Sequence, residues 1–265
     1  MAEYQTRLGH LGEALRWHQE ARKRNPVEGY KWTRECFGFL NIGDVLSAEK
    51  CARQLREAHP DKVISQGTWW VFHRYRGEWK LAIATLESVS ERVPGFRPWR
   101  WLLADLIAGQ GDVERARQLM AEAYPELLLD RLDPAVIDLK AAVIFAAILH
   151  ANGETQRRDV LLRATEERIA TMHRIRGAGY GILDVYIHAM RGDRDQAIAG
   201  LREAINMGWR SSYPVYDGSW WMLRQDWKLG TLHQDPEFIA MVHELEADIR
   251  KQRQWYEEHK DDPLF

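Results

Sequence analysis

The chain has 265 residues, of which 45% are hydrophobic and 29% charged, so it can bury a sizeable core as one large or two ordinary domains. Its 37 basic and 39 acidic residues give a net charge of −2, which excludes a strong field for nucleic acid or anionic lipid. The longest apolar stretch, residues 141–149, is too short to cross a bilayer, so we expect no membrane insertion.

A 34-residue period organises the first part of the chain, because glycine, alanine and proline recur in the same phase. Each glycine is expected to end a helix, the acid after it to begin the next, and each alanine to let two antiparallel helices approach closely. Proline then stops the second helix, so each unit is predicted to be a helical hairpin. The recurring residues are Gly9, Gly43, Gly77 and Gly111; Ala14, Ala48, Ala82 and Ala116; and Pro26, Pro60 and Pro94.

This pattern resembles the tetratricopeptide repeat family, whose unit is also 34 residues long. The matching residues are Trp32, Gly43, Ala48 and Pro60 in the second unit, Trp70, Gly77, Ala82, Leu86 and Pro94 in the third, and Leu103, Ala104, Gly111, Ala116, Met120 and Ala123 in the fourth. The resemblance implies an all-α, right-handed superhelical solenoid. Residues 1–124 form its regular repeats, and the first repeat is incomplete. We therefore expect the chain to be cut inside a longer protein.

Residues 125–208 are predicted to form two irregular hairpins, because Gly153 and Gly192 continue the glycine series after insertions. Asp133-Pro134 reads as a helix start that leads into residues 136–149. About six hairpins result in total.

Residues 209–265 are predicted to form an irregular aromatic segment, residues 211–221, and then a helix beginning at Asp235-Pro236-Glu237. The apolar face of this helix is expected to cap the last repeat, as solenoids require. The tail from Gly208 to Arg253 contains the strings Gly208-Trp209-Arg210, Trp220-Trp221 and Asp235-Pro236-Glu237-Phe238. In these strings it resembles the end of repeat arrays attached to bacterial winged-helix regulators and class III nucleotide cyclases. Whether the aromatic segment caps the array or serves self-association stays open, and so does the oligomeric state.

The ten histidines belong to no catalytic or metal-binding motif. We therefore expect that the protein is not an enzyme and binds no cofactor and no metal. Cys36 and Cys51 lack metal-ligand spacing and are expected to be buried free thiols in a cytoplasmic protein. A periplasmic location is the alternative for the tail of a membrane-anchored regulator.

The family resemblance places the first helices of the hairpins on a concave face, which implies a groove for a protein or peptide. Its lining mixes aromatic residues with arginine, as interface hot spots do, although each aromatic residue could instead pack between helices. The predicted groove residues are Tyr30, Arg34, Phe37, Asn41, Val71, Arg74, Tyr75, Trp101, Asp105, Lys140 and Tyr186.

Two functions follow from this sequence. The first is a non-catalytic protein–protein interaction scaffold that binds a peptide or a partner helix in the concave groove. The alternative is the sensory or effector arm of a bacterial transcription regulator or nucleotide cyclase, whose active or DNA-binding domain lies N-terminal to this chain.

Overall fold

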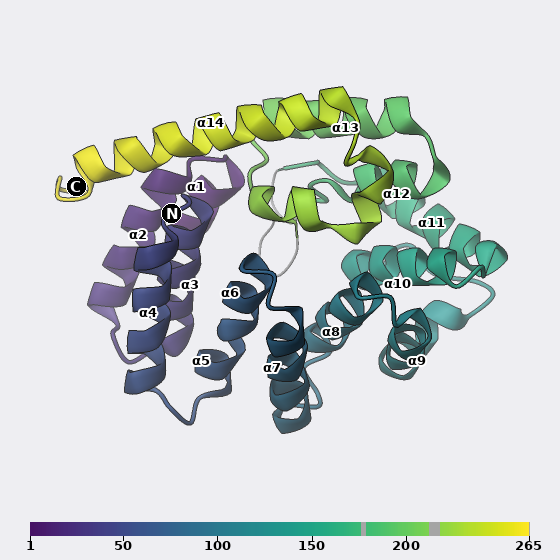
Figure 1. Cartoon of the computed structure of the whole chain (residues 1–265), viewed down its shortest axis with the longest axis horizontal. Coiled ribbons are helices and arrows are strands. Elements are labelled where there is room, and N and C mark those ends of the chain that lie inside the picture. Colours follow the sequence, from purple (N-terminus) through teal and green to yellow (C-terminus); the bar gives the residue numbers. More distant parts are fainter. Residues whose placement is uncertain (176–178, 212–217, 265) are drawn as a thin grey trace.

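The protein is helical throughout the parts that its computed structural model describes, residues 1–175, 179–211 and 218–264. The all-α class is therefore confirmed for these residues, which contain no strand beyond an isolated antiparallel bridge between Ser211 and Ser219. The helices follow one another around a curved array, with both termini on the same side of the molecule (Figure 1).

The first half of the array consists of α1 (Ala2–Arg7), α2 (Leu11–Arg24), α3 (Gly29–Asn41), α4 (Val45–Ala58), α5 (Val63–Gly67), α6 (Trp69–Tyr75), α7 (Trp79–Arg92), α8 (Pro98–Gly109) and α9 (Val113–Ala123). The second half consists of the 3₁₀ helix η1 (Pro125–Leu128), α10 (Leu139–Ala151), α11 (Thr155–Ile169), α12 (Leu183–Arg191), α13 (Arg194–Asn206), the 3₁₀ helices η2 (Trp220–Gln225) and η3 (Trp227–Leu232), and α14 (Pro236–His259).

The glycine series marks the helix ends as the sequence predicts. Gly9, Gly43, Gly77, Gly111, Gly153 and Gly192 all have φ between 71° and 91°, a region that strains any other residue. An acid follows each of these glycines except Gly9 and stands at the N-cap of the next helix, whereas His10 takes that place after Gly9. The side chains of Asp44 and Asp112 accept hydrogen bonds from the backbone N–H groups of Ser47 and Arg115.

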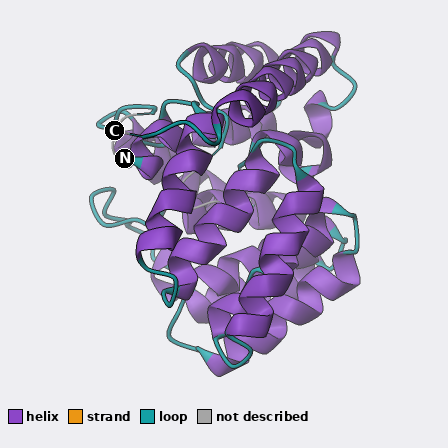
Figure 2. Ribbon diagram, turned by 90° about the vertical axis from the view of Figure 1, so that its left-hand side faces the viewer, coloured by secondary structure: helices purple, strands orange, loops and turns teal. Residues whose placement is uncertain are grey.

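The alanines at 48, 82 and 116 lie on the second helices of pairs that pack together, α3 with α4, α6 with α7 and α8 with α9. Ala48, Ala82 and Ala116 are completely buried, which is consistent with close helix–helix approach. The third unit differs, because its first helix is divided at Thr68 into α5 and α6, both of which pack against α7. Figure 2 shows the helices of the array running side by side, with other helices crossing them at the top.

The helix start predicted at Asp133-Pro134 is wrong. Residues 134–136 form a turn, and α10 begins at Leu139. Asp138 is its N-cap and accepts hydrogen bonds from the N–H groups of Lys140 and Ala141, so the stronger capping carboxylate lies five residues later.

The final helix, α14, begins at Pro236 as predicted, and Asp235 caps it by accepting from the N–H groups of Glu237 and Phe238. Its role is larger than capping the last repeat. It contacts α13 and η2 with one half and α2 with the other, so it spans from the last hairpin to the first (Figure 1).

The prediction of two free thiols is wrong, because Cys36 of α3 and Cys51 of α4 form a disulfide with a Cα–Cα distance of 5.3 Å. Both residues lie in the interface of one hairpin, where packing brings their side chains together. The fold thus carries a covalent link between two helices that are already neighbours.

Candidate functional site

The eleven predicted groove residues lie on first helices: four on α3, three on α6, two on α8, and one each on α10 and α12. We call this set the inner wall. Eight of the eleven are buried, Tyr75 and Lys140 are partly buried, and Tyr30 alone is exposed, at 41%. The inner wall is therefore mostly closed to an incoming partner.

The chain itself covers the inner wall. Residues 218–232, which we call the inner segment, lie inside the curve of the array as η2, η3 and their flanks (Figure 1). Its apolar residues Trp221, Met222, Leu223, Leu229 and Leu232 are buried. Residues 212–217 of the predicted aromatic segment lie outside the described residues.

The inner segment meets the inner wall through indole and hydroxyl groups. Trp220 Nε1 donates to the backbone oxygen of Asn41 at 2.8 Å, and the ring of Trp221 packs edge-on against Tyr75 with 5.5 Å between centroids. Tyr186 donates its hydroxyl to Asp226 at 2.8 Å. The inner segment thus occupies the wall as a bound peptide would.

A buried charge cluster forms the centre of this contact. Asp105 Oδ1 accepts from Lys228 Nζ at 2.6 Å and from Trp227 Nε1 at 2.9 Å. Lys228 Nζ also pairs with Asp226 at 2.8 Å, and Arg74 Nη1 lies 3.6 Å from Asp105 Oδ2. All four charged side chains of this cluster, those of Arg74, Asp105, Asp226 and Lys228, are at most 4% exposed.

The charges of the cluster hold one another ionised. Burial alone would lower the pKa of Lys228, but Asp105 and Asp226 raise it above its usual range. Burial would raise the pKa of Asp226, yet Lys228 and Arg74 hold it below its usual range. The cluster is thus a compensated set of ion pairs across the wall and the segment.

Little open space remains at the cluster. A cavity of about 10 Å³ lies against Arg74, Asp105, Lys140, Tyr186 and Asp226, which is room for about one water molecule. Substrate-sized ligands do not fit there.

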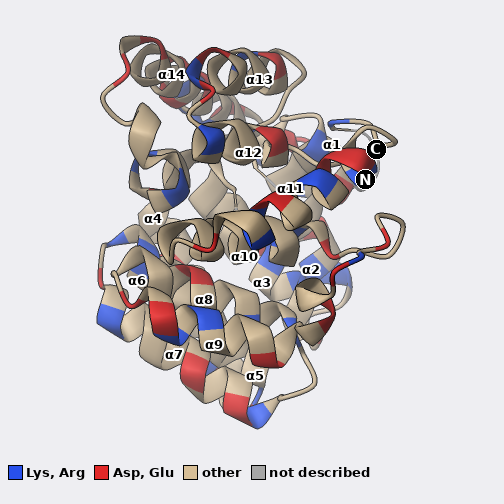
Figure 3. Cartoon of the chain, turned by 90° about the vertical axis from the view of Figure 1, so that its right-hand side faces the viewer, with Lys and Arg blue, Asp and Glu red and all other residues tan. Residues whose placement is uncertain are grey.

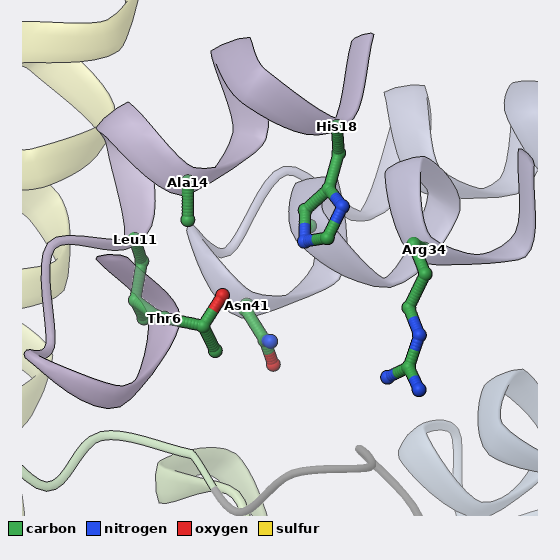
Figure 4. A pocket seen from close by; sticks show the side chains of 7 residues that line it. Thr6, Leu11, Ala14, His18, Arg34 and Asn41 are labelled. Carbon is green, nitrogen blue, oxygen red and sulfur yellow. The ribbon is translucent and has the colours of Figure 1, made fainter. Parts of the chain in front are cut away.

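A second cavity of the same size lies beneath α1 and α2, where the side chains of Thr6, His18 and Asn41 lie around one space and Arg34 extends away (Figure 4). Burial, with the neighbouring Arg34, lowers the pKa of His18 to about 4, so its imidazole is neutral at neutral pH. Asn41 Oδ1 accepts no hydrogen bond from the described residues.

An open depression continues the inner wall beyond the part that the inner segment covers. It measures about 430 Å³, and we call it the rim depression. Arg34 lies with its guanidinium 4.6 Å from the ring centroid of Tyr30. Its lining residues are Met1, Ala2, Glu3, Trp17, His18, Glu20, Ala21, Arg24, Glu28, Tyr30, Lys31 and Arg34.

The sequence interpretation did not predict that the inner segment covers the inner wall. The signal was two tryptophans followed by Asp226-Trp227-Lys228, because indole rings and paired charges are often buried against other parts of a chain. It also missed Trp17, which comes from a second helix, α2, and not from a first helix. The rim depression therefore combines residues that the repeat pattern assigns to different faces.

Within the described ranges there is no group of three or more His, Cys, Asp or Glu side chains placed to hold a metal ion. None of the helices described here has the length and apolar character needed to cross a bilayer. Basic and acidic residues are mixed along α7, α9 and α11 without a segment of one sign (Figure 3).

Comparison with protein families finds no family model that matches this chain, and comparison with curated proteins finds no significant match.

Proposed function

We propose that the protein is a non-catalytic scaffold that binds a partner polypeptide at the rim depression. The observation that carries the proposal is the exposure pattern of the inner wall, since the inner segment covers most of it and leaves Tyr30 open. A partner that approaches this face therefore meets the rim depression first.

The composition of the rim depression supports this proposal. Trp17, Tyr30 and Arg34 belong to the three residue types that dominate interface hot spots. The cations of the lining already have internal partners, because Arg34 donates to the Tyr30 hydroxyl, Arg24 pairs with Glu20 at 2.8 Å and Lys31 pairs with Glu28 at 3.3 Å. A partner with an apolar or aromatic side chain suits this lining better than a highly charged one.

We propose further that the helix pairs form a right-handed, tetratricopeptide-like solenoid. The recurring positive-φ glycines and the buried alanines at the helix contacts support it.

The disulfide bears on the compartment. Disulfides persist in oxidising compartments and are rare in the cytosol, so the Cys36–Cys51 link supports a periplasmic location over the cytoplasmic one. Titration of free thiols, before and after reduction, in protein recovered from the periplasm and from the cytoplasm distinguishes the two locations. The disulfide is present where thiols appear only after reduction.

Site-specific photo-crosslinking tests the function. A photoreactive phenylalanine replaces Tyr30 in one variant and Leu46, which is 81% exposed on α4, in the control. We expect one partner polypeptide to be crosslinked from position 30 and not from position 46, and the same partner to be lost when Trp17 is also replaced by alanine. Equal crosslinking from both positions, or none from position 30, would contradict the proposal.

A further inference from the structure

A second open depression, separate from the rim depression, lies between α4 and α7. Figure 1 shows α5 and α6 between these two helices, and α5 contacts both of them. The depression measures about 330 Å³, which falls within the range of about 300–1,000 Å³ that ligand pockets occupy. We call it the α4–α7 depression. Its lining residues are Arg56, Gln66, Trp69, His73, Leu81, Ala84, Thr85, Ser88 and Val89, and none of them lines the rim depression.

Trp69 and Leu81 give this depression an apolar surface. Trp69 is the first residue of α6 and is only partly buried, and its ring lies against those of Phe72 and His73, with 5.6 Å and 6.2 Å between centroids. Leu81, in the first turn of α7, is 52% exposed. An indole ring and an exposed leucine around one open space allow an aliphatic or aromatic side chain to dock there.

Arg56 of α4 lies against the same indole ring. Its guanidinium is 4.7 Å from the ring centroid of Trp69, which is a cation–π contact. Arg56 is exposed, and no carboxylate among the described residues pairs with it. The contact with the indole restricts the conformations of the arginine side chain, so less entropy is lost when the guanidinium binds a partner.

The charges around the depression favour a negatively charged ligand. None of the described residues that line it is acidic. Arg92 adjoins the lining, where it donates to Gln66 Oε1 and to the backbone oxygen of Asp61, and it too has no carboxylate partner among the residues that the structure describes. Glu78, which lies outside the lining, is already bonded to His73 at 2.6 Å. A carboxylate that enters the depression therefore meets unpaired guanidinium groups.

We propose that the α4–α7 depression binds an acidic segment of a partner polypeptide, in which a glutamate or aspartate stands beside an aromatic or aliphatic residue. The carboxylate accepts hydrogen bonds from the guanidinium of Arg56, and the apolar side chain packs against Trp69 and Leu81. The rim depression suits a partner without high charge, so the two depressions select different chemistry. The inference goes beyond the proposed function, because it gives the scaffold a second site that does not depend on the first.

Nuclear magnetic resonance of the indole N–H groups tests this binding on the full chain. The protein has 12 tryptophans, and the resonance of Trp69 is the one that Trp69→Phe removes. The probes are the peptide acetyl-Gly-Phe-Glu-Gly-amide and its uncharged match acetyl-Gly-Phe-Gln-Gly-amide. We expect the glutamate peptide to shift the Trp69 resonance until it saturates, and the glutamine peptide to bind about tenfold more weakly, since it loses a charge-assisted hydrogen bond. The resonance of Trp17, in the rim depression, should not move.

Two matched pairs of variants at exposed positions locate the site. Arg56→Gln should weaken binding of the glutamate peptide about tenfold and that of the glutamine peptide much less, whereas Arg53→Gln, on the same helix but outside the lining, should leave both nearly unchanged. Leu81→Ser should weaken both peptides alike, and Leu46→Ser, at a position of α4 that is 81% exposed, should weaken neither. An unmoved Trp69 resonance, equal affinity for the two peptides, or unchanged binding in Arg56→Gln would overturn the proposal.

Discussion

The charge cluster between the inner wall and the inner segment gives the sharpest prediction for stability. Asp105 is 2% exposed and compensates Lys228 and Arg74. Asp105→Asn keeps the shape of the side chain but leaves two buried cations facing the single carboxylate of Asp226. Removing one partner of a buried ion pair costs about 3–5 kcal/mol, which for a domain of this size lowers the Tm by roughly 10 °C.

Calorimetry and urea unfolding of the natural chain and the variant measure this loss. Asp130→Asn is the matched control, because the Asp130 side chain is 99% exposed and its loss should cost less than about 0.5 kcal/mol. The double variant Asp105→Asn with Lys228→Met should regain part of the stability, since it removes the uncompensated cation with its partner. An unchanged Tm in Asp105→Asn, or strictly additive losses in the double variant, would refute the reasoning.

Two further predictions concern acid and reduction. Burial lowers the pKa of His18 from its usual 6.5 to about 4, so the unfolded chain binds the proton more tightly. The free energy of unfolding should therefore fall by about 3 kcal/mol as the pH drops from 6.5 to 4. Urea unfolding at pH 6.5 and pH 4 should show a smaller loss of stability in His18→Gln than in the natural chain. Equal losses in both proteins would contradict the role of His18. Reducing the Cys36–Cys51 disulfide, whose cysteines are 15 residues apart, should cost about 3 kcal/mol, and an unmoved Tm with reductant would show that the link contributes nothing.

Local rules made much of the fold predictable. The positive φ of Gly43 and the cap at Asp44 depend on residues within one turn, so the sequence alone places them. The burial of Ala48 follows from its recurrence in phase with the glycines. The helix start at Leu139 escaped prediction because two capping carboxylates, Asp133 and Asp138, precede the same apolar run.

The covering of the inner wall could not be predicted, because it depends on contacts between distant parts of the chain. Trp227 and Asp105 are 122 residues apart, and the inner segment has no periodic pattern that would assign it a partner. The disulfide could have been predicted from the sequence, because Cys36 and Cys51 lie on the two packed helices of one predicted hairpin. Their spacing matches no metal or redox motif, so only the packing of the two helices indicates the pair.

Hydrogen–deuterium exchange across residues 218–232 tests most directly whether the inner segment covers the inner wall. The backbone N–H groups of Met222 and Leu229 bond within the segment, to Ser219 and Asp226, and the segment is buried against α6, α8 and α12. We expect these amides to exchange as slowly as those in the middle of α8 and α10. Exchange as fast as that of the exposed residues near Val27 would contradict the account, because the inner wall would then be open to solvent.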